Sequence, residues 1–149
     1  NHLAAKLGKD VKAHSAGSAP SGRLNPFALE ALNRAGIDTS AYRSKSWDEF
    51  ALSGAPKLDF AFTVCDNAAG EVCPVWPGQP MTAHWGVPDP TTVEGTDTQM
   101  AKAFMDTAIT LKRRIELVMS LPLNSLAGMS LQREIIGSAG PALERMRSD

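Results

Sequence analysis

The sequence predicts an α/β fold built on a parallel sheet, and two observations lead to that class. Segments with strand character alternate along the chain with segments whose apolar residues have helical spacing, which is typical of parallel strands joined by helices. The clearest strand, residues 58–64, is apolar at nearly every position after Asp59, as expected for a strand covered on both faces. With 149 residues, the chain fits one domain with its own hydrophobic core.

The N-terminal part of the chain predicts a helix, a strand and a second helix. Residues 1–8 have the apolar spacing of two helical turns and end at a glycine, which is a natural C-cap. Because this helix has no visible beginning and no initial Met, we expect the sequence to be incomplete at its N-terminus. Residues 11–17 alternate weakly and predict a short strand. Asn25 and Pro26 then predict the start of a helix that ends at Gly36.

Two capping boxes predict further helix starts. The box from Ser46 to Glu49 predicts a short helix, and the box from Thr96 to Gln99 predicts the longest helix, residues 97–120. That helix carries one continuous apolar stripe in steps of three and four: Met100, Phe104, Ala108, Leu111, Ile115 and Val118.

Two segments complete the predicted organisation. Residues 81–85 form a second candidate strand, which leads into a segment rich in proline. The consecutive basic residues 112–114 of the longest helix are expected to form a solvated face rather than a binding patch.

The composition argues against several classes of function. A net charge of −1 argues against broad nucleic-acid binding, which needs a basic surface. No window holds 18 consecutive apolar residues and no signal peptide is visible, so no membrane partner is expected. Two cysteines do not make a disulfide scaffold, so we expect a cytoplasmic protein, and disulfides in that compartment are usually transient and catalytic.

The only cysteines, Cys65 and Cys73, bracket a segment that directly follows the strand at 58–64. Asn67 and Gly70 within it tolerate the backbone angles of a tight turn, which allows the segment to fold back on itself. The pair therefore predicts a reversible disulfide and redox chemistry. Two reduced cysteines in or near the core are an equally supported interpretation, because cysteine is among the most buried residue types.

One carboxylate, Asp89, lies between two prolines in the run WGVPDP. The prolines restrict the backbone on either side, and a carboxyl held near apolar groups can have a raised pKa and act as a proton donor. The residues alone favour the alternative, in which Asp89 caps the turn that begins at Pro90.

Two further polar positions carry weaker signals. His84 lies in a strand-like run and is interpreted as structural. A zinc site made of Cys65, Cys73 and His84 is not expected, because seven residues separate the cysteines where common zinc motifs have about two to four. Neither a metal nor a cofactor is predicted. Ser15 ends the first predicted strand, where it either donates a hydrogen bond toward a neighbouring loop or forms part of a plain turn.

Several segments, in this order, resemble arsenate reductases of the low-molecular-weight tyrosine-phosphatase type. The matching segments are SAG at 15–17, NP at 25–26, GID at 36–38, RSKS at 43–46 and FTVC at 62–65. The most specific match is CDNAAGEVCP at 65–74, followed by HWGVPDP at 84–90. The resemblance covers residues 1–131, which we expect to form one domain, followed by a partly helical tail at 132–149. It implies a three-layer fold with helices on both faces of the sheet.

The resemblance also implies a three-thiol relay that reduces arsenate. In the family, a cysteine in a Cys-x5-Arg loop attacks arsenate, a carboxylate in an Asp-Pro segment protonates the leaving oxygen, and a second cysteine attacks the first as arsenite leaves. Asp89 matches the proton donor, Cys65 the second cysteine, and Cys73 the third, which resolves the mixed disulfide. Thioredoxin or a glutaredoxin-like partner then reduces the Cys65–Cys73 pair. Ser15 matches a weak, supporting position for the substrate.

The sequence departs from that family in one respect, because neither cysteine begins a Cys-x5-Arg motif. The nucleophile, the anion-binding loop and the first strand are expected upstream of Asn1, and we expect the chain alone not to reduce arsenate. Two alternatives stay open. A low-molecular-weight phosphatase needs neither a second nor a third cysteine, so the pair counts against it. A non-catalytic redox-sensing or binding module of the same fold would lack the loop altogether.

Overall fold

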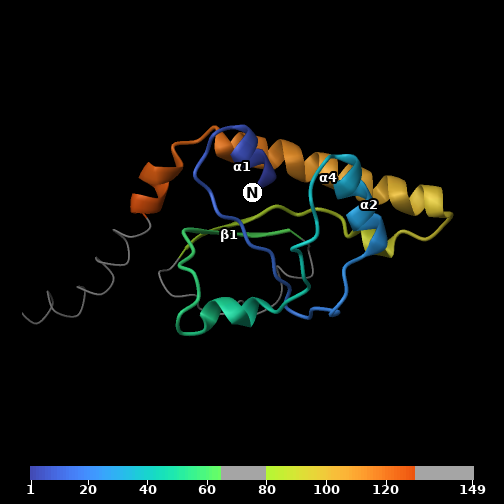
Figure 1. Ribbon diagram of the computed structural model, residues 1–149, viewed down its shortest axis with the longest axis horizontal. Coiled ribbons are helices and arrows are strands. Elements are labelled where there is room, and N and C mark those ends of the chain that lie inside the picture. Colours follow the sequence, from blue (N-terminus) through green and yellow to red (C-terminus); the bar gives the residue numbers. More distant parts are fainter. Residues whose placement is uncertain (65–79, 130–149) are drawn as a thin grey trace, which may run out of the picture.

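The computed structural model describes residues 1–64 and 80–129. The elements in this part are α1 (His2–Lys6), α2 (Pro26–Arg34), the 3-10 helix η1 (Trp47–Ala51), β1 (Phe60–Thr63), β2 (Met81–His84), the 3-10 helix η2 (Pro90–Thr92) and α4 (Asp97–Met119). Residues 123–129 are also helical. Figure 1 shows α1, α2 and α4 on one side of the parallel strands and η1 on the other. The α/β class with helices on both sides of parallel strands is therefore confirmed. The predicted tail at 132–149 lies outside the described residues.

The two strands pair in parallel with Phe60 opposite Met81 and Thr63 opposite His84. Both form where the sequence predicts them and are slightly shorter than expected. The expectation that 58–64 is covered on both faces is wrong, because Phe62 remains 37% exposed. Its ring packs against Trp85, with ring centroids 4.4 Å apart, and this partner covers only part of the ring.

The strand predicted at 11–17 does not form. This segment makes a single parallel bridge, in which the Gly17 N–H donates to the Lys45 carbonyl at 3.0 Å and the Trp47 N–H donates to the Gly17 carbonyl at 3.0 Å. Earlier in the segment, the N–H and carbonyl of Ala13 bond to the side-chain amide of Asn1 instead of to a strand. Residues 12–16 are exposed, so the weak alternation of the sequence has no buried face to specify a register.

The predicted starts of α2 and α4 are confirmed. The Asn25 side chain accepts a hydrogen bond from the Phe27 N–H at 2.9 Å, and Pro26 occupies the first helical position. Thr96 and Gln99 form a reciprocal capping box at the start of α4, with the Thr96 N–H donating to the Gln99 side chain at 2.9 Å. Beyond α2, Gly36 has a φ of +75°, which a glycine adopts without strain.

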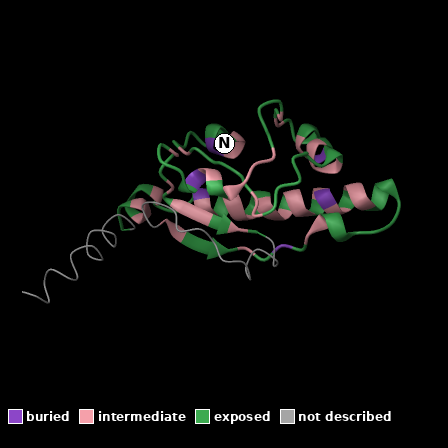
Figure 2. Ribbon diagram, turned by 90° about the horizontal axis from the view of Figure 1, so that it is seen from below, coloured by how far each residue is buried: buried purple, intermediate pink, exposed green. Residues whose placement is uncertain are grey.

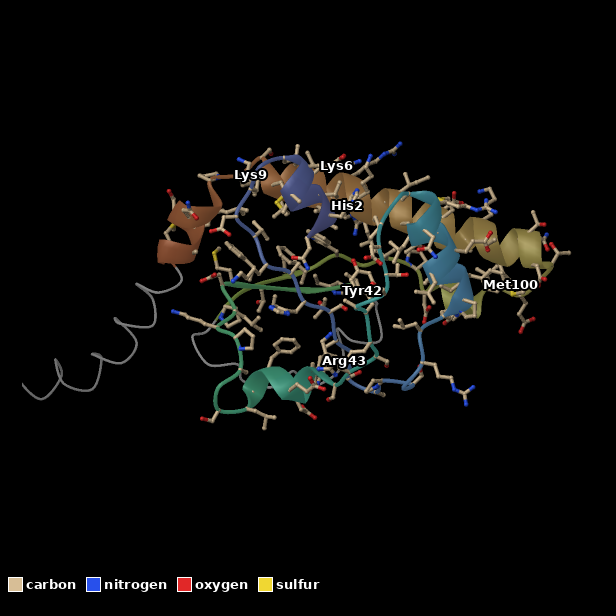
Figure 3. All side chains as sticks on the ribbon, viewed as in Figure 1. His2, Lys6, Lys9, Tyr42, Arg43 and Met100 are labelled. Carbon is tan, nitrogen blue, oxygen red and sulfur yellow. The ribbon has the colours of Figure 1, made fainter. Side chains whose placement is uncertain are left out.

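The capping box predicted at Ser46 is only half formed. The Ser46 hydroxyl accepts from the Asp48 N–H at 3.2 Å, and the helix that follows is the short 3-10 helix η1. The Glu49 carboxylate does not reach back to Ser46, because it forms a bidentate ion pair with Arg43, at 2.9 and 2.5 Å. Figure 3 shows Arg43 beside η1.

Within residues 1–64 and 80–129 the core is small, and most residues are half-buried or exposed (Figure 2). The buried apolar residues are Ala4, Ala31, Phe50, Val87, Phe104 and Met119. Helix α4 packs against α1, α2 and η2, and the Phe27 ring of α2 stacks on Phe104 at 5.9 Å between centroids. The long helix is therefore the element that holds η2, and with it the turn at Asp89, against the rest of the molecule.

Candidate active site

The segment that leads to Asp89 is attached to the carboxyl end of β1. Beyond the last paired residues, the Trp85 N–H donates to the Thr63 carbonyl and the Val87 N–H donates to the Val64 carbonyl, both at 2.8 Å. Ligands in open α/β sheets bind at the carboxyl ends of the strands. The attachment therefore brings the chain before Asp89 to the edge of the sheet where a site is expected.

The spacing of these hydrogen bonds reveals an extra residue in the chain that follows β2. The N–H groups of Met81 and Trp85 bond to carbonyls 22 positions earlier (81 to 59 and 85 to 63), whereas that of Val87 bonds to one 23 positions earlier (87 to 64). Between the last two of these bonds the chain advances two residues after β2 (85 to 87) but only one residue at the end of β1 (63 to 64). The extra residue, Gly86, forms a bulge. Bulges are common beside active sites, where they change the direction of a side chain.

Asp89 itself is the N-cap of η2. Its Oδ1 accepts from the Thr91 N–H at 2.9 Å and from the Thr91 hydroxyl at 2.7 Å, and its main-chain carbonyl accepts from the Thr92 hydroxyl at 2.8 Å. The capping interpretation of the sequence is thus correct. Among the described residues these bonds involve only Oδ1, so Oδ2 is left for a group outside the turn.

A cavity of about 330 Å³ lies beside this turn. Residues 86–90 and η2 form one wall, and α4 forms the other through Ala103, Asp106, Thr107, Thr110 and Arg114. The hydroxyls of Thr107 and Thr110 both donate to helix carbonyls at 3.0 Å, and Asp106 pairs with Lys102 at 2.5 Å. The other two charged side chains that line the cavity are Asp89 and Arg114. Within the described residues, neither forms an ion pair.

Arg114 contradicts the sequence interpretation of residues 112–114 as a solvated face. It is half-buried, and its Nη1 donates to the carbonyl of Trp85, at the bulge. The signal that predicts this position is its phase on the helix, because Arg114 lies three residues after Leu111 and four before Val118, within the apolar stripe. Lys112 and Arg113 are exposed, as predicted.

His84 joins the two strands, since its Nδ1 lies 2.7 Å from the hydroxyl of Thr63, directly opposite in the register. This position fits the structural interpretation of the sequence. In residues 1–64 and 80–129 no three His, Cys, Asp or Glu side chains gather closely enough to hold a metal ion. In the same ranges, no helix has both the length and the apolar character that crossing a membrane requires.

Of the remaining predicted residues, the structure describes only Ser15, and it does not bring Ser15 together with Asp89. Ser15 is exposed and precedes the Gly17 bridge to η1, and it does not line the cavity beside Asp89. Cys65 and Cys73 lie outside the described residues. Val64, which precedes Cys65 in the sequence, is described and accepts the bond from Val87.

The sequence matches the family of the low molecular weight phosphotyrosine protein phosphatases over residues 1–127. The chain belongs to this family. The match includes both strands, the Asp89 turn and α4. The predicted resemblance is therefore confirmed at the level of the family, which is a family of enzymes.

Relatives within the family carry a more specific name. The arsenate reductase of Halalkalibacterium halodurans is 36% identical over 110 residues, which are 74% of this chain and 76% of that protein. The arsenate reductases of Bacillus licheniformis and Bacillus subtilis are 40% and 38% identical over 91 residues, in each case 61% of this chain and 62% of the relative. The chain thus spans about three quarters of the first relative and less than two thirds of the other two.

Proposed function

We propose that the protein is an arsenate reductase, which converts arsenate to arsenite through a relay of cysteine thiols. Family membership and the names of the relatives support this activity. Within the structure, one observation carries it. The hydrogen bond from the Val87 N–H to the Val64 carbonyl ties the segment before Asp89 to the residue that precedes Cys65. The segment before Asp89 and the last described residue before Cys65 thus meet at the same edge of the sheet.

In this proposal Asp89 is the general acid of the first step. A thiolate in a Cys-x5-Arg loop attacks arsenic, an As–O bond breaks, and the carboxyl of Asp89 supplies the proton with which the oxygen leaves as water. The two bonds from Thr91 fix Oδ1, so the orientation of the carboxyl is set and Oδ2 is the oxygen that carries the proton. A fixed acid needs little reorganisation when the leaving oxygen develops charge.

Cys65 and Cys73 carry the electrons in the later steps. The Cys65 thiolate attacks the sulfur bound to arsenic, the S–As bond breaks, and its electron pair stays on arsenic, which leaves as arsenite. The Cys73 thiolate then attacks Cys65, releases the first thiolate and forms the Cys65–Cys73 disulfide. Two electrons from a dithiol of thioredoxin or a glutaredoxin-like protein reduce this pair. Ser15 is a supporting position for the substrate.

The relay places the protein in the cytoplasm. Its last step consumes reducing equivalents from a dithiol protein, and such donors are kept reduced in that compartment. A permanent disulfide between Cys65 and Cys73 would block the relay, so the pair must cycle.

Arsenate-dependent oxidation of NADPH by the full-length protein tests the function. We expect turnover when thioredoxin and thioredoxin reductase, or glutaredoxin with glutathione and glutathione reductase, are supplied, and loss of that turnover in Cys65→Ser and Cys73→Ser. The same preparation is assayed with p-nitrophenyl phosphate. Hydrolysis of that ester without arsenate turnover under either reductant would contradict the proposal and favour a phosphatase.

Thiol titration tests the relay directly. After one equivalent of arsenate is added without a reductant, we expect two thiols to disappear and mass mapping to find Cys65 joined to Cys73. A disulfide needs Cα atoms within about 7 Å, so the pair must approach at least transiently. Two thiols that remain free after arsenate has been turned over once would rule out the relay.

A further inference from the structure

Arg114 is a half-buried cation of the site that the thiol relay does not use. It lies in the last third of α4, 29 residues from Trp85, and its Nη1 donates to the Trp85 carbonyl. A guanidinium that donates to a carbonyl forms a stronger hydrogen bond than two neutral groups do. The contact therefore fixes a point on the backbone four residues before Asp89.

The position of that contact matters for how the backbone before Asp89 is held. Trp85 begins the bulge, where the regular ladder to β1 is interrupted and the backbone is held less well. Three constraints from three directions then define the segment, namely the ladder bonds to β1, the Asp89 cap on η2, and Arg114 on α4. Among the described residues, the hydrogen bond that joins the bulge to the long helix comes from Arg114.

Arg114 acts on the backbone and does not pair with the carboxylate. The two side chains line the same cavity, yet within residues 1–64 and 80–129 no ion pair joins them. A direct pair would favour the ionised form of Asp89, which cannot donate a proton. A bond to the Trp85 carbonyl holds the segment in place and leaves the acid free to bind its proton.

We propose that Arg114 is a positioning residue for Asp89, which sets the direction of the carboxyl by clamping the bulge at Trp85 to α4. The kinetic consequence rests on the proposed function, since it needs Asp89 to be the acid. The structural consequence, a fixed bulge, does not depend on the proposed function.

The structural part is tested by amide hydrogen exchange in the full-length protein, without substrate. Arg114→Met keeps most of the side-chain stem and removes the guanidinium. We expect exchange at Val87 and Thr91 to accelerate roughly tenfold or more, as for loss of a charged hydrogen bond. Arg114→Lys, which keeps a donor, should restore part of the protection. Arg113→Met removes an exposed neighbour of the same type and should change nothing.

The amide of Phe104, in the middle of α4, serves as the reference for global opening. Equal acceleration at Phe104 and Val87 would mean that the variant destabilises the whole fold, and it would overturn the proposal. Unchanged exchange at Val87 in Arg114→Met would overturn it as well.

The kinetic part uses a double-mutant cycle in the arsenate assay. We expect Arg114→Met to lower kcat about 10- to 100-fold, with KM for arsenate changed less than about threefold, as for a misplaced catalytic group. In an Asp89→Asn background the same substitution should have almost no further effect on kcat, because the group that it positions is already lost. A full additional loss in that background would show that Arg114 does not act through Asp89.

The two parts separate this inference from the proposed function. A wild-type protein without arsenate turnover would refute the function, and exchange at Val87 would still decide whether Arg114 holds the bulge. An active wild type with additive effects of Arg114→Met and Asp89→Asn would refute the inference and leave the function intact.

Discussion

Residues 85–89 and residues 9–17 are both irregular segments, and they are held in very different ways. The first is fixed by two ladder bonds to β1, by the Asp89 cap and by Arg114. The second has one bridge at Gly17, the contacts of Ala13 with the Asn1 side chain, and the His14 ring against Phe50 of η1, 5.4 Å between ring centroids. One segment buries Val87, whereas the other buries no residue.

The difference shows what an irregular segment needs in order to aim a functional group. In the Asp89 segment each anchor comes from a different element, so the turn cannot rotate without breaking several contacts. The segment at 9–17 also has partners on separate elements, at the N-cap of α1 and on η1, but residues 12–16 remain exposed. Partners on separate elements are therefore not sufficient for a precise site, and the burial of Val87 is what distinguishes the Asp89 segment.

The largest expected effect is that of Asp89→Asn in the full-length protein. Asparagine keeps an oxygen that can accept both bonds from Thr91, so the cap survives and only the proton donor is lost. We expect kcat to fall about 10²–10⁴-fold, the usual contribution of general acid catalysis, while KM changes little. Steady-state kinetics with arsenate measures this. A kcat equal to that of the wild type would make Asp89 a cap and nothing more.

A pair of matched deletions compares how firmly the two segments are held. Val87→Ala removes two methyl groups from a side chain that is 6% exposed, and we expect it to lower the free energy of unfolding by about 2 kcal/mol. Val11→Ala makes the same change in the looser segment, at a half-buried position, and should lower it by less than about 1 kcal/mol. Urea unfolding of both variants gives the two values. Equal losses would remove the contrast on which this comparison rests.

Ser15→Ala tests whether the looser segment contributes to catalysis. An exposed hydroxyl that supports a neighbouring loop contributes one neutral hydrogen bond, so kcat/KM should fall at most about tenfold. Ser18→Ala, three residues further along the chain and just beyond this segment, is the control. A loss as large as that of Asp89→Asn would show that Ser15 is held in the complete site as firmly as Asp89.

The smallest effect concerns the exposed ion pair beside the Gly17 bridge. The hydrogen bond from Arg43 lowers the pKa of Glu49 below its ordinary value of 4.5. Because the folded-state pKa is depressed, the pair stabilises the protein above the ordinary pKa and loses this contribution as the pH falls through the lowered one. Arg43→Met should raise the pKa of Glu49, which NMR titration measures. Exposure of both side chains keeps the effect on stability small.

Much of this fold is readable in the sequence, because its helices begin at residues whose local chemistry is unambiguous. Asn25 with Pro26, and Thr96 with Gln99, form the caps that their residue types predict. The Ser46 box failed because Glu49 has a second partner, Arg43, which no local pattern reveals. The strand at 11–17 failed for a related reason, since strand formation depends on a neighbour from another part of the chain.

The site was predictable only where one segment determines it. The cap by Asp89 follows from the order Asp-Pro-Thr, which favours a turn closed by the carboxylate. The contact of Arg114 depends on the packing of α4 against the segment that follows β2, and on the bulge in that segment. Both features involve residues that are far apart in the sequence. Helical phase alone assigns Arg114 to the buried stripe, but it does not name the carbonyl that Arg114 binds.

The bulge at Gly86 also makes the length of this segment a part of the site. If Gly86 were deleted, the segment would either close the bulge or place Pro88 in the position that Val87 now occupies. In the second case the change is severe. Proline has no N–H to donate to the Val64 carbonyl, so the last bond to β1 would be lost along with the buried side chain. The number of residues between β2 and Pro88 is therefore a structural requirement of the site. A change of one residue would alter the direction of this segment even if every side chain of the site were retained.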